Sequence, residues 1–218
     1  EVNMTFLGGG FGRKAFMDYT TEAVAISKEI KAPVKVIWTR EDDMTQGPFR
    51  PGAMYRLNGV LKDGKIAAMR TRFAGQNMGL QDSKTFDGTK PNNDMVEGFV
   101  EDYLETIPDY HFTDVPTDAP IPVMWWRSVY SSTNNFAYES FMDEMAVAAG
   151  KDPLEFRKAH LKSERVKKLL DKLSAMSGWA NRKKGEGYGV AITHCFGSFS
   201  GQVVKVSKNE SGGVKIDK

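Results

Sequence analysis

The sequence has 218 residues, of which 40% are hydrophobic and 27% charged, the composition of an ordinary globular protein. Its 30 basic and 28 acidic residues leave a net charge of +2, which is too small to indicate binding to nucleic acid or to an anionic membrane. No apolar run reaches the roughly eighteen residues of a transmembrane span. The single cysteine, Cys195, excludes an internal disulfide framework and a CxxC metal site on this chain.

A glycine cluster, Gly8-Gly9-Gly10-Phe11-Gly12-Arg13-Lys14, follows the apolar run at residues 2–7. Glycines let the backbone approach a ligand, and their N–H groups with a helix start behind them favour an anion such as phosphate. The cluster is not a P-loop, because Ala15 follows Lys14, and Arg13 stands where GxGxxG requires its third glycine. A strand-to-helix turn without a ligand fits the same residues.

The next elements are predicted from periodicity and turn signals. A helix is expected from Asp18 or Thr20 to a point before Pro33, then a buried strand at 34–38 and a solvated loop at 39–43. Strands at 55–62 and 65–73 flank Asp63-Gly64, a strong hairpin signal. We expect a long loop at 75–93 and extended chain between Pro108 and Pro122, while 96–103 fits either a helix or a strand.

Two adjacent tryptophans precede an arginine in the stretch Trp125-Trp126-Arg127-Ser128. Arginine is the preferred side chain for binding phosphate or carboxylate, which indicates a binding site. The alternative is a pair of core aromatic residues with Arg127 at the rim.

The last third of the chain predicts three helices and a hairpin. Helices are expected at 134–149, from the capping residue Asp152 onward, and from Ser163 to Gly178, followed by strands at 188–194 and 202–207. We therefore predict an α+β fold in which antiparallel hairpins pack with helices. No HExxH or Gly-x-Ser-x-Gly pattern occurs, so any chemistry must come from a bound cofactor or from other parts of the protein.

Several motifs together resemble the molybdenum-binding subunit of the xanthine oxidase family of hydroxylases, and most of all the branch formed by the β subunits of isoquinoline 1-oxidoreductases. That branch has Trp-Arg-Ser where the xanthine enzymes have Phe-Arg-Gly. The resemblance covers nearly the whole chain, and its motifs are residues 8–14, 38–42, 126–128, 135–144, 150–157 and 194–198.

The resemblance implies a molybdopterin-binding domain of the xanthine oxidase and aldehyde oxidoreductase type. Residues 1–187 would form the first part of the cofactor-binding region, and 188–218 the start of a second, truncated unit. The cofactor is expected to be molybdopterin with molybdenum, in the cytosine dinucleotide form. Its predicted contacts on this chain, with no protein ligand to the metal, are Gly9, Gly10, Phe11, Gly12, Arg13, Trp126, Arg127 and Ser128.

The implied reaction is hydroxylation of an N-heteroaromatic or aldehyde substrate with oxygen from water. Electrons would leave to a [2Fe-2S] subunit or a cytochrome. Ala15 replaces the glutamate that xanthine-type enzymes use to recognise a purine, which argues against a purine substrate. The family's catalytic glutamate is expected outside these residues, so we predict an inactive fragment without a catalytic residue of its own, which could dimerise.

Two alternatives remain, a non-catalytic module that binds a cofactor or partner and an unrelated phosphate-binding α/β domain. The hydroxylase hypothesis requires Phe11 and Arg127 in one cleft, whereas the phosphate-binding domain requires only the glycine cluster and a helix start. The residues do not decide between the bacterial cytoplasm and the periplasm.

Overall fold

The structure is a computed structural model that describes residues 3, 5–78, 93–98, 101–117, 120–183 and 185–217. The chain forms two compact units. Unit 1 comprises residues 1–53, 75–90 and 116–129, and unit 2 comprises residues 54–74, 91–115 and 130–218. All residues predicted to bind the cofactor belong to unit 1. The expected division at residue 187 lies within unit 2 and stays a prediction.

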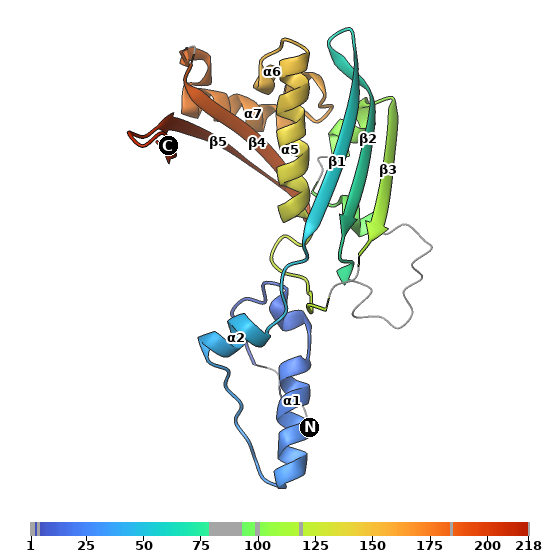
Figure 1. Ribbon diagram of the computed structural model, residues 1–218, viewed down its shortest axis with the longest axis vertical. Helices are drawn as coiled ribbons and strands as arrows, with labels where there is room; N and C mark the ends of the chain where they lie inside the picture. The colour runs from blue at the N-terminus through green and yellow to red at the C-terminus, as the bar shows by residue number, and fades with distance from the viewer. Residues whose placement is uncertain are drawn as a thin grey trace. The chain divides into compact units, whose positions relative to one another are not determined.

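The described elements of unit 1 include the 3₁₀ turn η1 (Arg13–Ala15) and the helices α1 (Asp18–Ile30) and α2 (Arg40–Gln46) (Figure 1). The predicted first helix is confirmed. The prediction of a loop at 39–43 is wrong, because a capping box starts α2 there. The Asp42 N–H donates to the Thr39 hydroxyl, and the Asp42 carboxylate accepts from the Thr39 N–H at 3.0 Å. These bonds satisfy two backbone donors of the first turn.

The strand predicted at 34–38 does not form. Exposure alternates along it as a strand would require, since Val34 and Val36 are half-buried while Lys35 and Ile37 are exposed. No described strand pairs with this segment. The alternating pattern of the sequence thus indicates which side chains turn inward. A β-strand also requires a neighbouring strand that accepts and donates its backbone hydrogen bonds.

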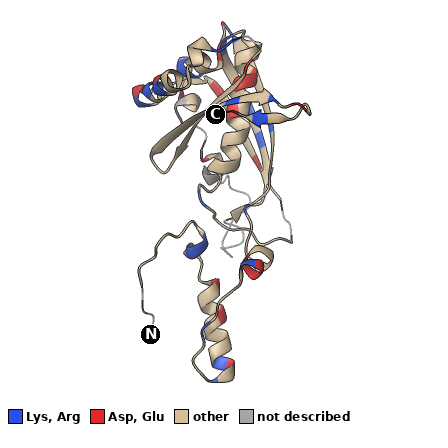
Figure 2. Ribbon diagram, turned by 90° about the vertical axis from the view of Figure 1, so that its left-hand side faces the viewer, with Lys and Arg blue, Asp and Glu red and all other residues tan. Residues whose placement is uncertain are grey.

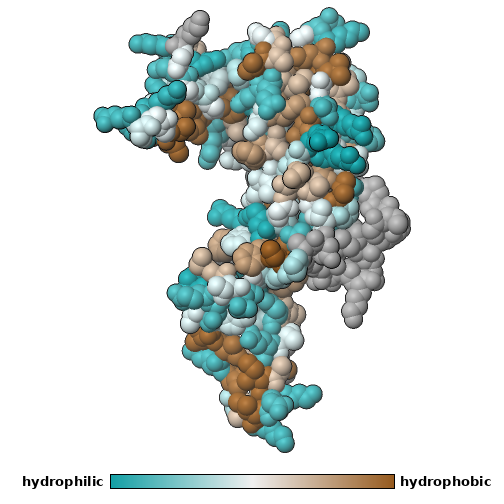
Figure 3. Space-filling view, in the orientation of Figure 1, coloured by the Kyte–Doolittle hydropathy of each residue, from teal (hydrophilic) through white to brown (hydrophobic). Residues whose placement is uncertain are grey.

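Helix α1 buries none of its residues. Acidic and basic residues both occur along it (Figure 2), and the Trp38 indole N–H donates to the Glu22 carboxylate at 2.9 Å. Apolar side chains gather on the surface of this unit (Figure 3), among them the exposed Val24, Ile26, Ile30 and Ile37. Helix α1 therefore contributes no buried residue to the core of unit 1.

The first sheet of unit 2 has the strand order β1-β2-β3. Strands β1 (Ala53–Lys62) and β2 (Lys65–Gly75) form the predicted hairpin, with positive φ at Asp63 and Gly64 as a type I′ turn requires. Strand β3 (Asp109–Pro116), predicted only as extended chain, runs beside β2 in the same direction (Figure 1). The connection from β2 to β3 contains η2 (Asn93–Val96) and α4 (Glu101–Thr106). Most of the loop expected at 75–93 lies outside the described residues.

The second sheet is antiparallel, with the order β4-β5-β6. Helix α5 packs against β4 and, in Figure 1, stands between the two sheets. Its buried Met142, Met145 and Ala146 join one hydrophobic core with residues of both sheets. Helices together with antiparallel hairpins confirm the predicted α+β class. The remaining elements of unit 2 are α5 (Ser131–Ala148), α6 (Pro153–Ala159), α7 (Glu164–Ser177), η3 (Trp179–Asn181), β4 (Gly187–Cys195), β5 (Ser198–Lys208) and β6 (Val214–Ile216).

The described residues contain neither a membrane-spanning helix nor a metal cluster. No helix among them has both the length and the hydropathy needed to cross a bilayer. No three His, Cys, Asp or Glu side chains among them stand where they could hold a metal ion together.

His160 links the end of α6 to β2. Its Nε2 accepts from the Ile66 N–H at 2.9 Å, so its Nδ1 donates to the Phe156 carbonyl at 2.7 Å and the ring is neutral. Burial lowers the pKa of His160. The folded protein therefore binds fewer protons than the unfolded chain between that lowered pKa and the ordinary value of about 6.5.

We accordingly expect the free energy of unfolding to be highest above about pH 6.5 and to fall as the pH is lowered below it. Urea unfolding at about pH 7.5 and about pH 5.5 measures this difference. In His160→Gln, which removes the titrating ring, the difference should shrink even though the variant is less stable. An equal pH dependence in both proteins would contradict this role.

Candidate cofactor-binding site

The glycine loop, Gly8–Lys14, is a compact turn whose backbone depends on glycine. Gly9 and Gly12 have φ of +113° and +82°, in the left-handed region. The Lys14 N–H donates to the Gly10 carbonyl at 3.1 Å, and the Ala15 N–H donates to the Gly12 carbonyl at 3.0 Å. Since these two donors are used inside the turn and α1 begins only at Asp18, the loop does not aim a helix N-terminus at an anion.

Gly12 brings the glycine loop against the second predicted segment. A Cβ at this position would lie 2.1 Å from the Trp125 carbonyl oxygen, closer than any side chain tolerates. The Phe16 ring packs on the Trp125 indole at 5.1 Å between centroids. The loop and the Trp125 backbone can therefore touch only because residue 12 is glycine.

Phe11 and Arg127 make the second contact between the two segments. The Arg127 guanidinium carbon lies 5.9 Å from the centroid of the Phe11 ring, within the range of a cation–π interaction. Phe11 itself has a φ of +53° and is 59% exposed, so its ring is available to a ligand. Ser128 donates its hydroxyl to the Arg127 carbonyl at 2.6 Å.

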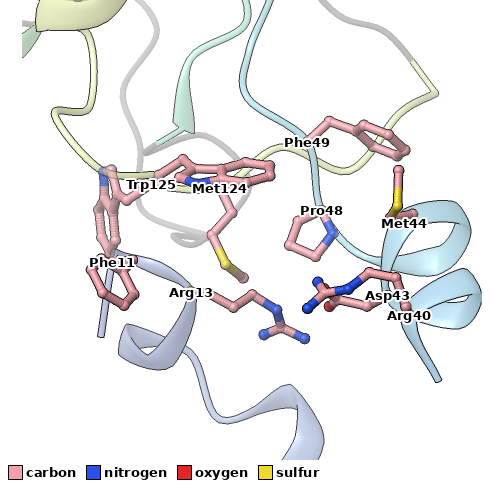
Figure 4. A pocket seen from close by; sticks show the side chains of 10 residues that line it. Phe11, Arg13, Arg40, Asp43, Met44, Pro48, Phe49, Met124 and Trp125 are labelled. Atoms are coloured by element: carbon pink, nitrogen blue, oxygen red, sulfur yellow. The ribbon is translucent and has the colours of Figure 1, made fainter. Parts of the chain in front are cut away.

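A cavity of about 380 Å³ opens where these segments meet (Figure 4). Aromatic and apolar side chains form most of its wall, while Arg13, Arg40 and Asp43 give it a charged side (Figure 4). Three of the predicted cofactor contacts, Phe11, Arg13 and Trp126, line it directly, and so does Trp125, which belongs to the stretch that the sequence singled out. The full lining is Phe11, Arg13, Arg40, Asp43, Met44, Pro48, Phe49, Met124, Trp125 and Trp126.

The two arginines of the lining differ in how firmly they are held. Arg13 forms an ion pair with Asp18 at 2.7 Å. Partial burial acts to raise the pKa of the Asp18 carboxyl, but Arg13 donates to it and the net pKa lies below the ordinary value. Arg40 contacts Asp43 at 3.3 Å from a largely exposed position, so its guanidinium can turn toward a ligand at little cost.

These residues fit a molybdopterin cofactor. Planar heterocycles pack between aromatic and apolar side chains, which Phe11, Trp125 and Met124 provide, and phosphate groups pair with guanidinium groups such as Arg13 and Arg40. The predicted glycines contribute by letting the backbone turn tightly and approach Trp125. Phe49, Arg40 and Asp43 were not among the predicted cofactor contacts. Arg40 and Asp43 belong to the run at 39–43 that was predicted as a solvated loop, although residues 38–42 are also one of the motifs of the resemblance.

The fold matches the solved structures of two oxidoreductases. Quinoline 2-oxidoreductase from Pseudomonas putida 86 superposes with a TM-score of 0.61 at 18% identity, covering 85% of this chain and 27% of that one. Aldehyde oxidoreductase from Desulfovibrio gigas gives a TM-score of 0.63 at 16% identity, covering 96% of this chain and 25% of that one. At these identities the likeness establishes the fold.

The chain belongs to the molybdopterin cofactor-binding domain family, whose pattern matches residues 1–161. It is 29% identical to the beta subunit of isoquinoline 1-oxidoreductase from Brevundimonas diminuta over 206 residues, 91% of this chain and 26% of the relative. It is 30% identical to the B subunit of nicotinate dehydrogenase from Pseudomonas putida KT2440 over 193 residues, 82% of this chain and 16% of the relative. The chain spans about a quarter or less of these relatives, and the resemblance drawn from its motifs is confirmed.

Proposed function

We propose that this chain is part of a molybdenum-dependent hydroxylase that oxidises N-heteroaromatic compounds or aldehydes, and that the unit 1 cavity contacts its molybdopterin. The observation that carries the proposal is the joint packing of the glycine loop and Trp125–Arg127, through Gly12 against Trp125 and Phe11 beneath Arg127. The names of the relatives support the substrate classes, since they act on isoquinoline, nicotinate and aldehydes.

The cofactor, when bound, would supply the redox chemistry that inserts oxygen from water into a carbon–hydrogen bond. The residues described above would bind and orient it: Phe11 and Trp126 beside its ring system, Arg13 and Arg127 toward its anionic groups, and Gly9, Gly10, Gly12 and Ser128 through the shape of the backbone. A cytosine dinucleotide form would bring more phosphate to the arginines. We assign the general base to a glutamate outside these 218 residues, so the piece alone would be inactive.

The electron acceptor would be a separate [2Fe-2S] subunit or a cytochrome. Support comes from two relatives that are named as subunits of larger enzymes. A homodimer of the isolated chain is a further proposal, supported by the apolar side chains that α1 leaves exposed.

Molybdenum and pterin analysis of the full-length protein, purified with its partner subunits, tests this function. Near-stoichiometric molybdenum with released pterin is expected, and Arg127→Ala should lower the molybdenum content about tenfold by removing a charged contact to the cofactor. Arg70→Ala, at an exposed position of β2, should load like the wild type. Absence of both molybdenum and pterin, in a host that loads a known hydroxylase, would favour a non-catalytic module, whereas nucleotide binding that survives Arg127→Ala would favour a phosphate-binding domain.

A further inference from the structure

The segment Trp126–Val129, which we call the Arg127 turn, has an unfavourable backbone conformation. Ser128 and Val129 have φ of +63° and +44°. Left-handed backbone is costly for any residue with a Cβ and most costly for a β-branched one such as Val129. The turn is closed by the Val129 N–H, which donates to the Trp126 carbonyl at 2.7 Å. Such a conformation persists only where its surroundings hold it.

Arg50 provides that support. One terminal nitrogen, Nη1, donates to the Val129 carbonyl at 3.0 Å, and the other, Nη2, donates to the Arg127 carbonyl at 2.9 Å. The guanidinium also lies 5.8 Å from the centroid of the Trp126 ring. The two donors of one rigid guanidinium group thus bind the backbone on both sides of Ser128. Two separate cations could not fix the distance between the two carbonyl groups in this way.

The backbone around Arg50 is itself anchored to the segment that leads into the turn, residues 122–124. The Phe49 N–H donates to the Pro122 carbonyl at 2.8 Å, and the Phe49 carbonyl accepts from the Met124 N–H at 3.1 Å. Residues 49 and 123 form a parallel bridge. Because these bonds fix the Cα of residue 50 relative to the turn, little conformational entropy is lost when the arginine side chain makes its two bonds.

We propose that Arg50 is a positioning residue, which holds the Arg127 turn in the conformation that presents Trp126 and Arg127 to the cofactor. This inference rests on the proposed function, because it assigns the cofactor as the ligand that the turn meets. Arg50 donates to two backbone carbonyls of the turn and lies against the Trp126 ring, and through these contacts it would act on the cofactor. Partial burial lowers the pKa of the Arg50 guanidinium, which remains charged at neutral pH.

The experiment compares Arg50→Ala, Arg50→Lys and Arg56→Ala in the full-length protein with its partner subunits. Arg56 is exposed on β1 in unit 2, so its replacement removes the same charge away from the turn. Amide hydrogen exchange of a peptide that contains Trp126–Val129 is measured on cofactor-free protein, and molybdenum and pterin are measured on protein from a host that makes the cofactor.

In Arg50→Ala, the Val129 amide should exchange about tenfold faster or more, since two charge-assisted hydrogen bonds are lost. Molybdenum content should fall with it. Arg50→Lys should lie between Arg50→Ala and the wild type, because one ammonium cannot reproduce the fork. Arg56→Ala should match the wild type in both measurements. The lysine variant keeps the comparison informative if the alanine variant does not fold.

The outcomes separate this inference from the function on which it rests. Unchanged exchange in Arg50→Ala and Arg50→Lys overturns the positioning role whatever the molybdenum content is. Faster exchange with full molybdenum loading also overturns it, because the turn would then be irrelevant to the cofactor. If even the wild type carries neither molybdenum nor pterin, the proposed function fails, and the cofactor role of Arg50 fails with it, while the exchange data still decide whether Arg50 holds the turn.

Discussion

Gly12→Ala is expected to lower molybdenum loading of the full-length protein by well over tenfold. Its Cβ would lie 2.1 Å from the Trp125 carbonyl oxygen and 3.1 Å from the Trp126 Cα. Both are backbone atoms, which cannot rotate away as a side chain can. The left-handed φ of +82° adds about 1–2 kcal/mol of strain for a residue with a Cβ. The glycine loop must therefore move away from Trp125, which separates Phe11 from Arg127.

Gly8→Ala is the matched control for this prediction. Gly8 also has a left-handed φ, +65°, but a Cβ there would meet nothing within 4 Å. It should cost about 1–2 kcal/mol of local stability and leave loading close to that of the wild type. If Gly12→Ala loads molybdenum as well as Gly8→Ala does, contact between the loop and Trp125 is not needed, and the site proposed for unit 1 is wrong.

The two segments of this site could be found from the sequence, but their meeting could not be derived from it. Gly8–Lys14 and Trp125–Arg127 each carry a local signal, glycines in one case and an arginine after aromatic residues in the other. They lie more than 100 residues apart in the chain, and no periodicity or turn signal specifies contacts over such a separation. Only the family resemblance predicted the convergence. Arg50 was missed because it binds backbone carbonyl groups, and every residue carries one, so the sequence does not mark its partners.

The helices and the hairpin were predictable because their determinants are local. Asp152 caps α6 with its carboxylate accepting from the Leu154 and Glu155 N–H groups, as Asp-Pro at a helix start indicates. The strand predicted at 34–38 failed because pairing depends on a partner elsewhere. The loop predicted at 39–43 failed because Asp42 takes the place of the usual Glu or Gln in the capping box, and its shorter carboxylate still reaches the Thr39 N–H.

Arg157→Met is expected to destabilise unit 2 by about 3–5 kcal/mol, since it leaves a buried carboxylate without its cation. The Arg157 side chain is fully buried, and its Nε donates to Glu139 at 2.9 Å while Nη1 donates to Asp143 at 2.6 Å. Glu139 also accepts from the Ile192 N–H at 2.9 Å, which ties α5 to β4. Urea unfolding measures the loss. Lys158→Ala, which breaks only ion pairs at the surface, should cost about 1 kcal/mol or less.

The pH dependence of this variant identifies the cause of its instability. Burial already raises the pKa of Glu139, although Arg157 opposes that shift. Without the arginine, the folded-state pKa of Glu139 must rise further, so the folded protein binds more protons than the unfolded chain between about 4.3 and that raised value. Arg157→Met should therefore gain stability relative to the wild type as the pH falls from neutrality toward the lower end of this window.

The double variant Arg157→Met with Glu139→Gln should lose this pH dependence and recover part of the stability, because glutamine can still accept from Ile192. If the double variant is as unstable as Arg157→Met at every pH, lost packing is responsible, and the unpaired charge is not.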